Sequence, residues 1–121
     1  MQLINEKEME WTQVSEKLRI KYLLKDYAVT PNLISSGVSN WAQGKAGEPH
    51  VHPEHDEIYI VLRGRGLANI LGEVREVGPG DLLHAKAGEL HGMVEGLTEG
   101  GIEMFYALIP KENTTEKGEQ K

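Results

Sequence analysis

The chain contains no cysteine among its 121 residues. Disulfides and thiolate metal ligands are therefore excluded, and the redox compartment stays open because cysteine-free chains suit either. Basic residues are also few: 13 Lys and Arg stand against 19 Asp and Glu, which gives a net charge of -6 at pH 7. The chain lacks the basic footprint that contact with phosphate backbones requires, so we expect no nucleic-acid partner.

Long apolar runs are missing as well. No stretch approaches transmembrane length, and the first residues lack the basic and apolar regions of a signal peptide. We therefore expect no membrane partner and a cytoplasmic protein. At 121 residues the chain is long enough for one domain with a core and too short for two. Residues 111–121 contain nothing apolar, which predicts a disordered tail.

Glycine, in contrast, is abundant, with 14 residues that recur with proline between short apolar segments. These segments predict strands over 15–24, 33–41, 57–63, 67–71, 74–77, 81–86, 91–95 and 102–109. Many short strands separated by Gly and Pro turns are typical of an all-β sandwich or barrel. For residues 6–24 a helix is the alternative, because Glu, Lys and Met are good helix formers.

The segment 57–63 is apolar on both faces. Ile58, Ile60 and Leu62 share one face, and Tyr59 and Val61 share the other. A strand with one wet face should alternate, so this strand is expected to be covered on both sides. The barrel interior covers one side, and a partner subunit is a candidate for the other.

Two histidines lie two residues apart, at His50 and His52, so an extended chain presents both imidazoles on one face. Glu57 follows His52 by five residues, an odd offset that a straight strand sends to the opposite face. A turn or bulge from Pro53 to Asp56 can return the carboxylate to the histidines, because proline fixes φ and donates no ladder hydrogen bond.

A fourth ligand is offered by His91, which follows the flexible turn residue Gly88. Three imidazoles and one carboxylate suit a divalent transition metal such as Mn, Fe, Co, Ni, Cu or Zn. A metal that prefers five or six ligands leaves positions for water, substrate or dioxygen.

The same residues carry a family resemblance. The first cupin motif is a glycine, five residues, His-x-His, three or four residues, a glutamate, six residues and a glycine. Gly44, His50, His52, Glu57 and Gly64 match every fixed place, so the chain resembles the small single-domain cupins.

The second cupin motif is matched only in part. Gly80, Gly88 and His91 fall in register, but Lys86 stands where proline is usual and Glu95 where asparagine is usual.

The resemblance implies a cupin jelly-roll β-barrel over residues 25–110, preceded by an N-terminal extension over residues 1–24. Compact cupins commonly pair through N-terminal strands, so we expect a homodimer. It also implies that His50, His52, Glu57 and His91 are the metal ligands.

For function, we expect a metal-dependent enzyme that acts on a small oxygen-rich metabolite, with dioxygenase chemistry first and isomerase or lyase chemistry next. The alternatives are a non-catalytic cupin that binds or senses a sugar or organic acid, and a cupin whose metal is only structural. Tyr59 shares the parity of Glu57 and is a candidate acid or hydrogen-bond donor, or a packed ring. Lys86 offers a cation to an anionic substrate, or is a solvated loop residue.

Three further residues have open roles. His55 and His84 are each a spare ligand, a general base or an ordinary packed or exposed histidine. Glu95 is either an acceptor for a ligand imidazole or a surface charge. No nucleophile elbow or phosphate-cradling glycine loop is present, which argues against hydrolase triads and nucleotide chemistry.

Overall fold

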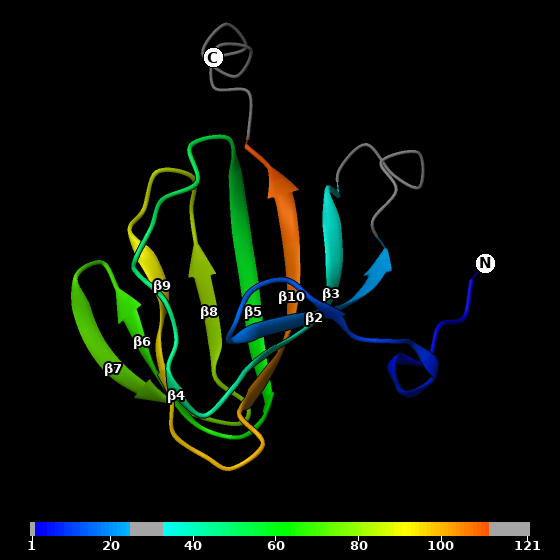
Figure 1. Ribbon diagram of the computed structural model, residues 1–121. Helices are drawn as coiled ribbons and strands as arrows, with labels where there is room; N and C mark the ends of the chain where they lie inside the picture. The colour runs from blue at the N-terminus through cyan, green and yellow to red at the C-terminus, as the bar shows by residue number, and fades with distance from the viewer. Residues whose placement is uncertain (1, 25–32, 112–121) are drawn as a thin grey trace, which may run out of the picture.

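The computed structural model describes residues 2–24 and 33–111, and these are built almost wholly from β-strands (Figure 1). A single 3-10 turn, η1 (Glu6–Glu8), precedes the sheets, and no α-helix occurs within the described ranges. The helix considered for residues 6–24 is therefore not formed. The strands are β1 (Thr12–Gln13), β2 (Leu18–Leu24), β3 (Ser35–Trp41), β4 (Gly44–Lys45), β5 (His55–Arg63), β6 (Gly66–Ile70), β7 (Glu73–Val77), β8 (Leu82–Ala85), β9 (His91–Gly96) and β10 (Ile102–Pro110).

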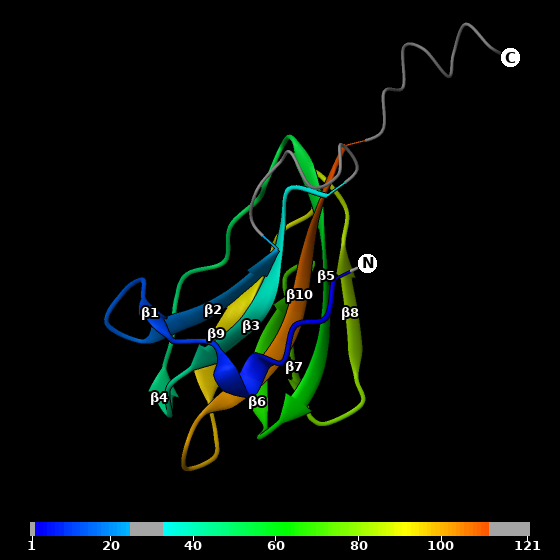
Figure 2. The same ribbon diagram turned by 90° about the vertical axis from the view of Figure 1, so that its right-hand side faces the viewer.

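The strands form two antiparallel sheets. The larger has the order β1-β2-β3-β10-β5-β8, and the smaller has the order β4-β9-β6-β7. Figures 1 and 2 show the two sheets facing each other as the walls of a barrel. The prediction of an all-β jelly-roll barrel with an N-terminal extension is confirmed.

The core lies between the sheets and takes side chains from both. The larger sheet contributes Val61, Ile102 and Met104, and the smaller sheet contributes Ala68, Val77 and Met93. All of these are less than a tenth exposed. Side chains alternate between the two faces of each strand, and these residues face inward. The other inward-facing positions on β5, β9 and β10 can therefore hold polar side chains.

The N-terminal extension is tied to the outer face of the larger sheet. Lys21 on β2 points outward, yet it is only 9% exposed because the extension covers it. Its Nζ donates to the carbonyl oxygen of Glu6 at 2.9 Å and to Oε1 of the same residue at 3.0 Å. The ammonium group also lies 4.7 Å from the centroid of the Trp11 ring. The buried cation therefore has both an anionic and an aromatic partner.

The predicted domain boundaries stay predictions. Residues 25–32, where the barrel was expected to begin, and residues 112–121 of the expected tail lie outside the described ranges. Lys111, the first residue of that tail, donates its amide to the carbonyl of Glu54 at 3.0 Å.

The outer face of β5 is only partly covered. In the register of the sheet, Phe105 on β10 lies opposite Ile60, and Ile60 lies opposite Leu82 on β8. These side chains are 36%, 37% and 63% exposed, respectively. The inner face of β5 is thus buried as expected. The described part of the chain does not bury the outer face, for which a covering element was also expected.

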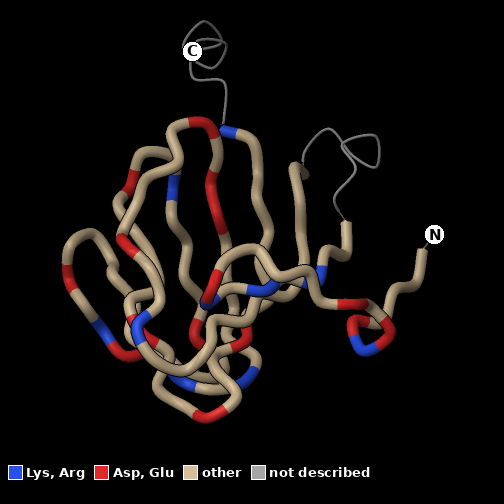
Figure 3. The backbone as a smooth tube through the Cα atoms, viewed as in Figure 1, with Lys and Arg blue, Asp and Glu red and all other residues tan. Residues whose placement is uncertain are grey.

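Charges are interspersed over the described part of the chain, with Lys and Arg scattered among Asp and Glu rather than gathered on one face (Figure 3). Within residues 2–24 and 33–111, no helix has the length and apolar character that crossing a bilayer requires.

Candidate metal centre

Two of the predicted ligands are joined through their backbones. His50 lies in the connection between β4 and β5, and His91 opens β9. The amide of His50 donates to the carbonyl of His91 at 2.7 Å, and the reverse hydrogen bond is 2.9 Å long. This isolated antiparallel bridge holds the two imidazole centroids 4.6 Å apart. The connection before β5 is therefore fixed to the smaller sheet.

Glu57 reaches the histidines from the larger sheet. The chain bends at Pro53 and Glu54, and β5 starts directly afterwards at His55. The predicted interruption between His52 and Glu57 is thus observed, and it places the Glu57 carboxylate on the inner face of β5, only 8% exposed.

The four predicted side chains converge. One ligand atom from each of His50, His52, Glu57 and His91 lies within 4.8 Å of all the others. Oε1 of Glu57 is 2.7 Å from Nε2 of His52 and 2.8 Å from Nε2 of His91. Glu57 and His91 are buried, whereas His52 is half-buried and His50 is exposed. The cluster is therefore set at one open side of the barrel interior.

Backbone carbonyls orient two of the rings. Nδ1 of His50 lies 3.2 Å from the carbonyl oxygen of Glu48, and Nδ1 of His91 lies 2.9 Å from that of Glu89. A carbonyl only accepts, so both Nδ1 atoms carry the hydrogen, and Nε2 of His91 faces Oε1 of Glu57. Such outer hydrogen bonds fix the tautomer of a metal-binding histidine.

Sequence reasoning missed this device, and no residue type signals it, because the acceptors are backbone carbonyls that every residue has. Glu95, the acceptor considered from the sequence, instead lies opposite Lys45 on β4 and Leu67 on β6.

This arrangement fits a divalent metal. In His91, Nδ1 carries the ring hydrogen, so Nε2 presents a lone pair unless it is also protonated. A lone pair and a carboxylate oxygen 2.8 Å apart repel each other, and only a proton or a metal ion between or beside them relieves the repulsion. Three imidazole nitrogens with one carboxylate suit the divalent transition metals expected from the sequence.

The cluster shifts the pKa values of its members in opposite directions. Burial by itself raises the pKa of Glu57, but hydrogen bonds from His91 and Tyr59 and the nearby imidazoles outweigh it, so the pKa falls below its usual value. The hydrogen bond to Glu57 raises the pKa of His91 against the effect of burial. Burial lowers the pKa of His52, and the charge of Glu57 only partly offsets this.

Tyr59 belongs to the cluster through its hydroxyl. Its phenol donates a hydrogen bond to Glu57, and burial, followed by the Glu57 charge, raises its pKa far above the usual range. Tyr59 therefore stays protonated as a donor. Lys86, the other candidate catalytic residue, is exposed and lines neither cavity beside the cluster. Its backbone amide donates to Oε1 of Glu89 at 2.9 Å.

The two spare histidines lie outside the cluster of four. The His55 ring stacks on His52 with centroids 4.4 Å apart, and its buried Nε2 has no hydrogen-bond partner within the described residues. His84 lies at the edge of the larger sheet, with Nε2 3.4 Å from Oδ2 of Asp56.

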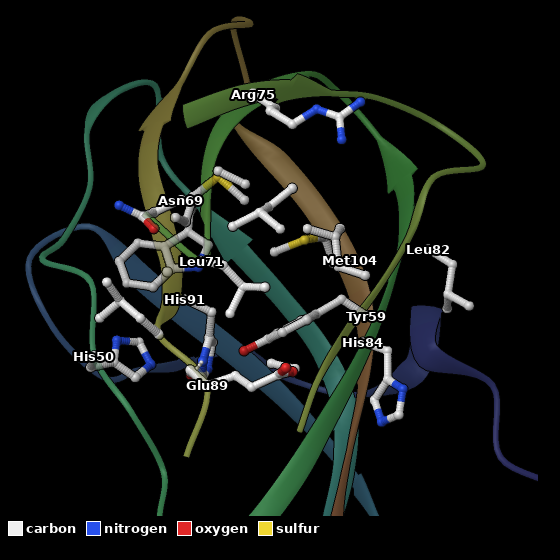
Figure 4. Close-up of a pocket in the computed structure, with 18 residues that line it drawn as sticks. His50, Tyr59, Asn69, Leu71, Arg75, Leu82, His84, Glu89, His91 and Met104 are labelled. Carbon is white, nitrogen blue, oxygen red and sulfur yellow. Dashed lines mark hydrogen bonds between the residues drawn. The ribbon is translucent and has the colours of Figure 1, made fainter. Parts of the chain in front are cut away.

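Two cavities flank the cluster. One, of about 310 Å³, extends between the two sheets and is lined at one end by His50, Tyr59 and His91 (Figure 4). The other, of about 590 Å³, reaches His52 and Glu57 from the side of β2 and β3. The cluster is therefore accessible to small molecules.

Comparison with known proteins is consistent with this geometry. A family model described as "Cupin domain" matches residues 37–106. The pectin degradation protein KdgF of Dickeya dadantii (strain 3937) is 40% identical over 72 residues, which is 60% of this chain and 64% of that protein. The match thus spans less than two thirds of the relative's length.

Solved structures show the same fold at lower identity. KdgF from Halomonas sp. superposes with a TM-score of 0.74 at 24% identity, covering 95% of this chain and 98% of that chain. A predicted oxalate decarboxylase from Thermotoga maritima gives a TM-score of 0.80 at 21% identity, covering 90% and 99%.

Proposed function

This chain belongs to the cupin family, and from that premise we propose that it is a metal-dependent enzyme acting on a small oxygen-rich metabolite. The proposed metal ligands are His50, His52, Glu57 and His91. The metal is a divalent transition ion of the series Mn, Fe, Co, Ni, Cu and Zn.

One observation carries this proposal: four donor atoms lie within 4.8 Å of one another, beside cavities large enough for a small molecule. A purely structural metal site is closed by protein ligands, whereas a catalytic site keeps an accessible position. His50 is exposed and lines both cavities, which supports an accessible position on its side of the cluster.

When bound, such a metal supplies Lewis-acid polarisation of a substrate oxygen and, if it is redox active, electron transfer to dioxygen. The protein supplies the fixed donors. The carbonyls of Glu48 and Glu89 hold two imidazoles in position, and hydrogen bonds from His91 and Tyr59 favour the ionised form of Glu57. Because these groups are set before the substrate arrives, little reorganisation is needed during the reaction.

The reaction we place first is dioxygenation of a chelating metabolite, in which both oxygen atoms of dioxygen enter the product. Isomerisation or elimination without dioxygen is the next candidate. The 40% identity to a pectin degradation protein supports including carbohydrate-derived acids in the set of compounds to be tested.

The first experiment measures metal content in protein purified without a chelator or a histidine tag. We expect close to one metal per chain in the wild type, and loss of the metal in His50→Ala and His91→Ala. His84→Ala is the matched control, because His84 is outside the cluster and should retain the metal. A wild type that holds no metal and resists reconstitution contradicts the proposal.

The second experiment measures turnover of carboxylates, hydroxyketones and sugar acids by the metal-loaded protein, with and without dioxygen. Turnover only with dioxygen supports dioxygenation, and turnover under both conditions supports isomerisation or elimination. Tight binding of a compound without any turnover assigns the protein instead to the non-catalytic binding class.

A further inference from the structure

Of the three ligand histidines, His52 is the one whose ring has no outer hydrogen bond to a backbone carbonyl. Nδ1 of His50 and Nδ1 of His91 each face a carbonyl oxygen, whereas Nδ1 of His52 has no such acceptor within the described residues. The carbonyl of His52 accepts from the amide of Gly88 at 2.9 Å, which anchors its backbone. The side chain is 32% exposed, and this backbone contact does not fix its two torsions.

His52 has instead a stacked partner, His55. The centroids of the two imidazole rings are 4.4 Å apart and their planes are inclined by 26°. The rings of His50 and His91 meet His52 at steeper angles of 69° and 51°. A near-parallel stack opposes rotation of either ring about its second side-chain torsion, because rotation separates the two faces.

His55 is itself anchored in the larger sheet. It is the first residue of β5 and pairs with Pro110 on β10. His55 and Glu57 lie two residues apart on this strand, so their side chains project from the same inner face. The stack therefore ties His52, in the connection before β5, to the strand that carries the carboxylate ligand.

The ring face of His55, rather than a hydrogen bond, makes this contact. Nε2 of His55 is buried and has no hydrogen-bond partner within the described residues. His55 also lies outside the group of four side chains whose donor atoms converge. A buried nitrogen without a partner is unfavourable, so a flat ring without nitrogen should fit this position at least as well.

We propose that His55 is a positioning residue of the metal centre, which holds the His52 imidazole in its ligating orientation by stacking on it. The stack does for His52 what backbone carbonyls do for the other two ligand histidines. This inference rests on the proposed metal site and adds a residue that sets its affinity without binding the metal.

The first test measures Co²⁺ affinity by competition with a chromogenic chelator, together with the visible spectrum of the bound ion. His55→Ala should weaken binding about fivefold, which corresponds to the loss of one stacked aromatic pair, and should alter the spectrum. His55→Phe keeps a stacked ring, so it should retain the wild-type affinity and spectrum with a melting temperature no lower than that of the wild type. His84→Ala, which removes a histidine outside the cluster, should leave affinity and spectrum unchanged.

Two results would overturn the role given to His55. Wild-type affinity and spectrum in His55→Ala would show that the ligand ring needs no stack. A loss in His55→Phe equal to that in His55→Ala would show that the nitrogens, not the ring face, matter. If His55→Ala does not fold, His55→Leu replaces it, because leucine fills the space without a flat face, and the same loss is expected.

A second test separates this inference from the proposed function. A wild type that binds no Co²⁺ contradicts the proposed function, and the stack is then judged in metal-free protein. The chain has five histidines, so the ring signals of ¹⁵N-histidine-labelled protein can be assigned by single substitutions. In His55→Leu, the ring-proton signals of His52 should move to lower field, because the stacked ring no longer shields them. Unchanged His52 signals overturn the inference whether or not metal binds.

Discussion

Nε2 of His91 lies 2.8 Å from Oε1 of Glu57, while Nδ1 of the same ring faces the carbonyl of Glu89 at 2.9 Å. The backbone contact fixes the ring so that its Nε2 edge faces the carboxylate, and this edge then holds either a proton or a metal. Metal binding and protonation therefore compete for one buried position.

In metal-free protein this pair predicts a pH-dependent stability. Because folding raises the pKa of His91, its interaction stabilises the folded state fully below the ordinary pKa of 6.5. This stabilisation is lost as the pH rises through the folded-state pKa. Because folding lowers the pKa of Glu57, its interaction stabilises the folded state fully above the ordinary pKa of 4.5. This stabilisation is lost as the pH falls through the folded-state pKa. Wild type should therefore exceed His91→Gln in free energy of unfolding most clearly between these two values.

Urea unfolding of both proteins in the presence of a chelator, repeated across the pH range, measures this difference. A difference that grows steadily from neutral to alkaline pH would show that the His91 interaction is not with a carboxylate.

The Tyr59 hydroxyl is predicted to tune the metal affinity. Tyr59→Phe removes a hydrogen bond that favours ionised Glu57, so the pKa of Glu57 should rise and protons should compete better with the metal. We expect metal affinity to fall about tenfold, within the range found for outer hydrogen bonds to metal ligands. Competition titration with a chromogenic chelator measures it.

Tyr106→Phe is the matched control for that substitution. Tyr106 projects from the same inner sheet face, but its hydroxyl lies 3.1 Å from Oγ of Ser35. An equal loss of metal affinity in both variants would mean that packing of the phenol, not its hydrogen bond to Glu57, sets the affinity.

The N-terminal extension is predicted to be held by the ion pair between Glu6 and Lys21. Glu6→Gln leaves the buried ammonium with the Glu6 carbonyl and the Trp11 ring but without its anion. We expect a loss of about 1.5–3 kcal/mol in the free energy of unfolding, as for a hydrogen bond to a charged group. Glu8→Gln, on the same turn but exposed, should be neutral. Equal stability of all three proteins in urea would exclude this interaction as an anchor.

The outer row of Phe105, Ile60 and Leu82 is predicted to be covered by a second copy of the chain. Three neighbouring strands expose apolar side chains there, and a two-fold dimer would bury the same row on both subunits. Ile60→Lys should then produce monomers in sedimentation velocity, whereas Val74→Lys, on the smaller sheet, should not. A wild type that sediments as a monomer at every concentration contradicts the homodimer.

Much of the fold followed from local pattern alone. The alternation of apolar residues predicted each major strand of the barrel, because a strand that packs one face must repeat with period two. The limits differ by a few residues at several ends: the segment predicted over 15–24 is β2 at Leu18–Leu24, and the strand expected from Glu57 begins at His55. Such ends depend on hydrogen bonds to neighbouring strands, which the local sequence does not specify.

The candidate site was predictable in its residues but not in its geometry. The spacing of His50, His52 and Glu57, with a bend at Pro53, indicated a chelating cluster, since few other uses require that pattern. Nothing local indicated that His50 and His91 would pair through their backbones, because they are distant in sequence and meet only when the sheets face each other.

By itself, the sequence determined the alternation that builds the barrel, the donor set that suits a divalent metal and the absence of thiolate ligands. Only the tertiary structure decided which nitrogen of His91 faces Glu57, how deeply each ligand is buried, and where the two cavities meet the cluster. The physical reason is range: alternation and turn preference act between neighbouring residues, whereas ring orientation, burial and cavity shape arise from contacts between strands brought together by the whole fold.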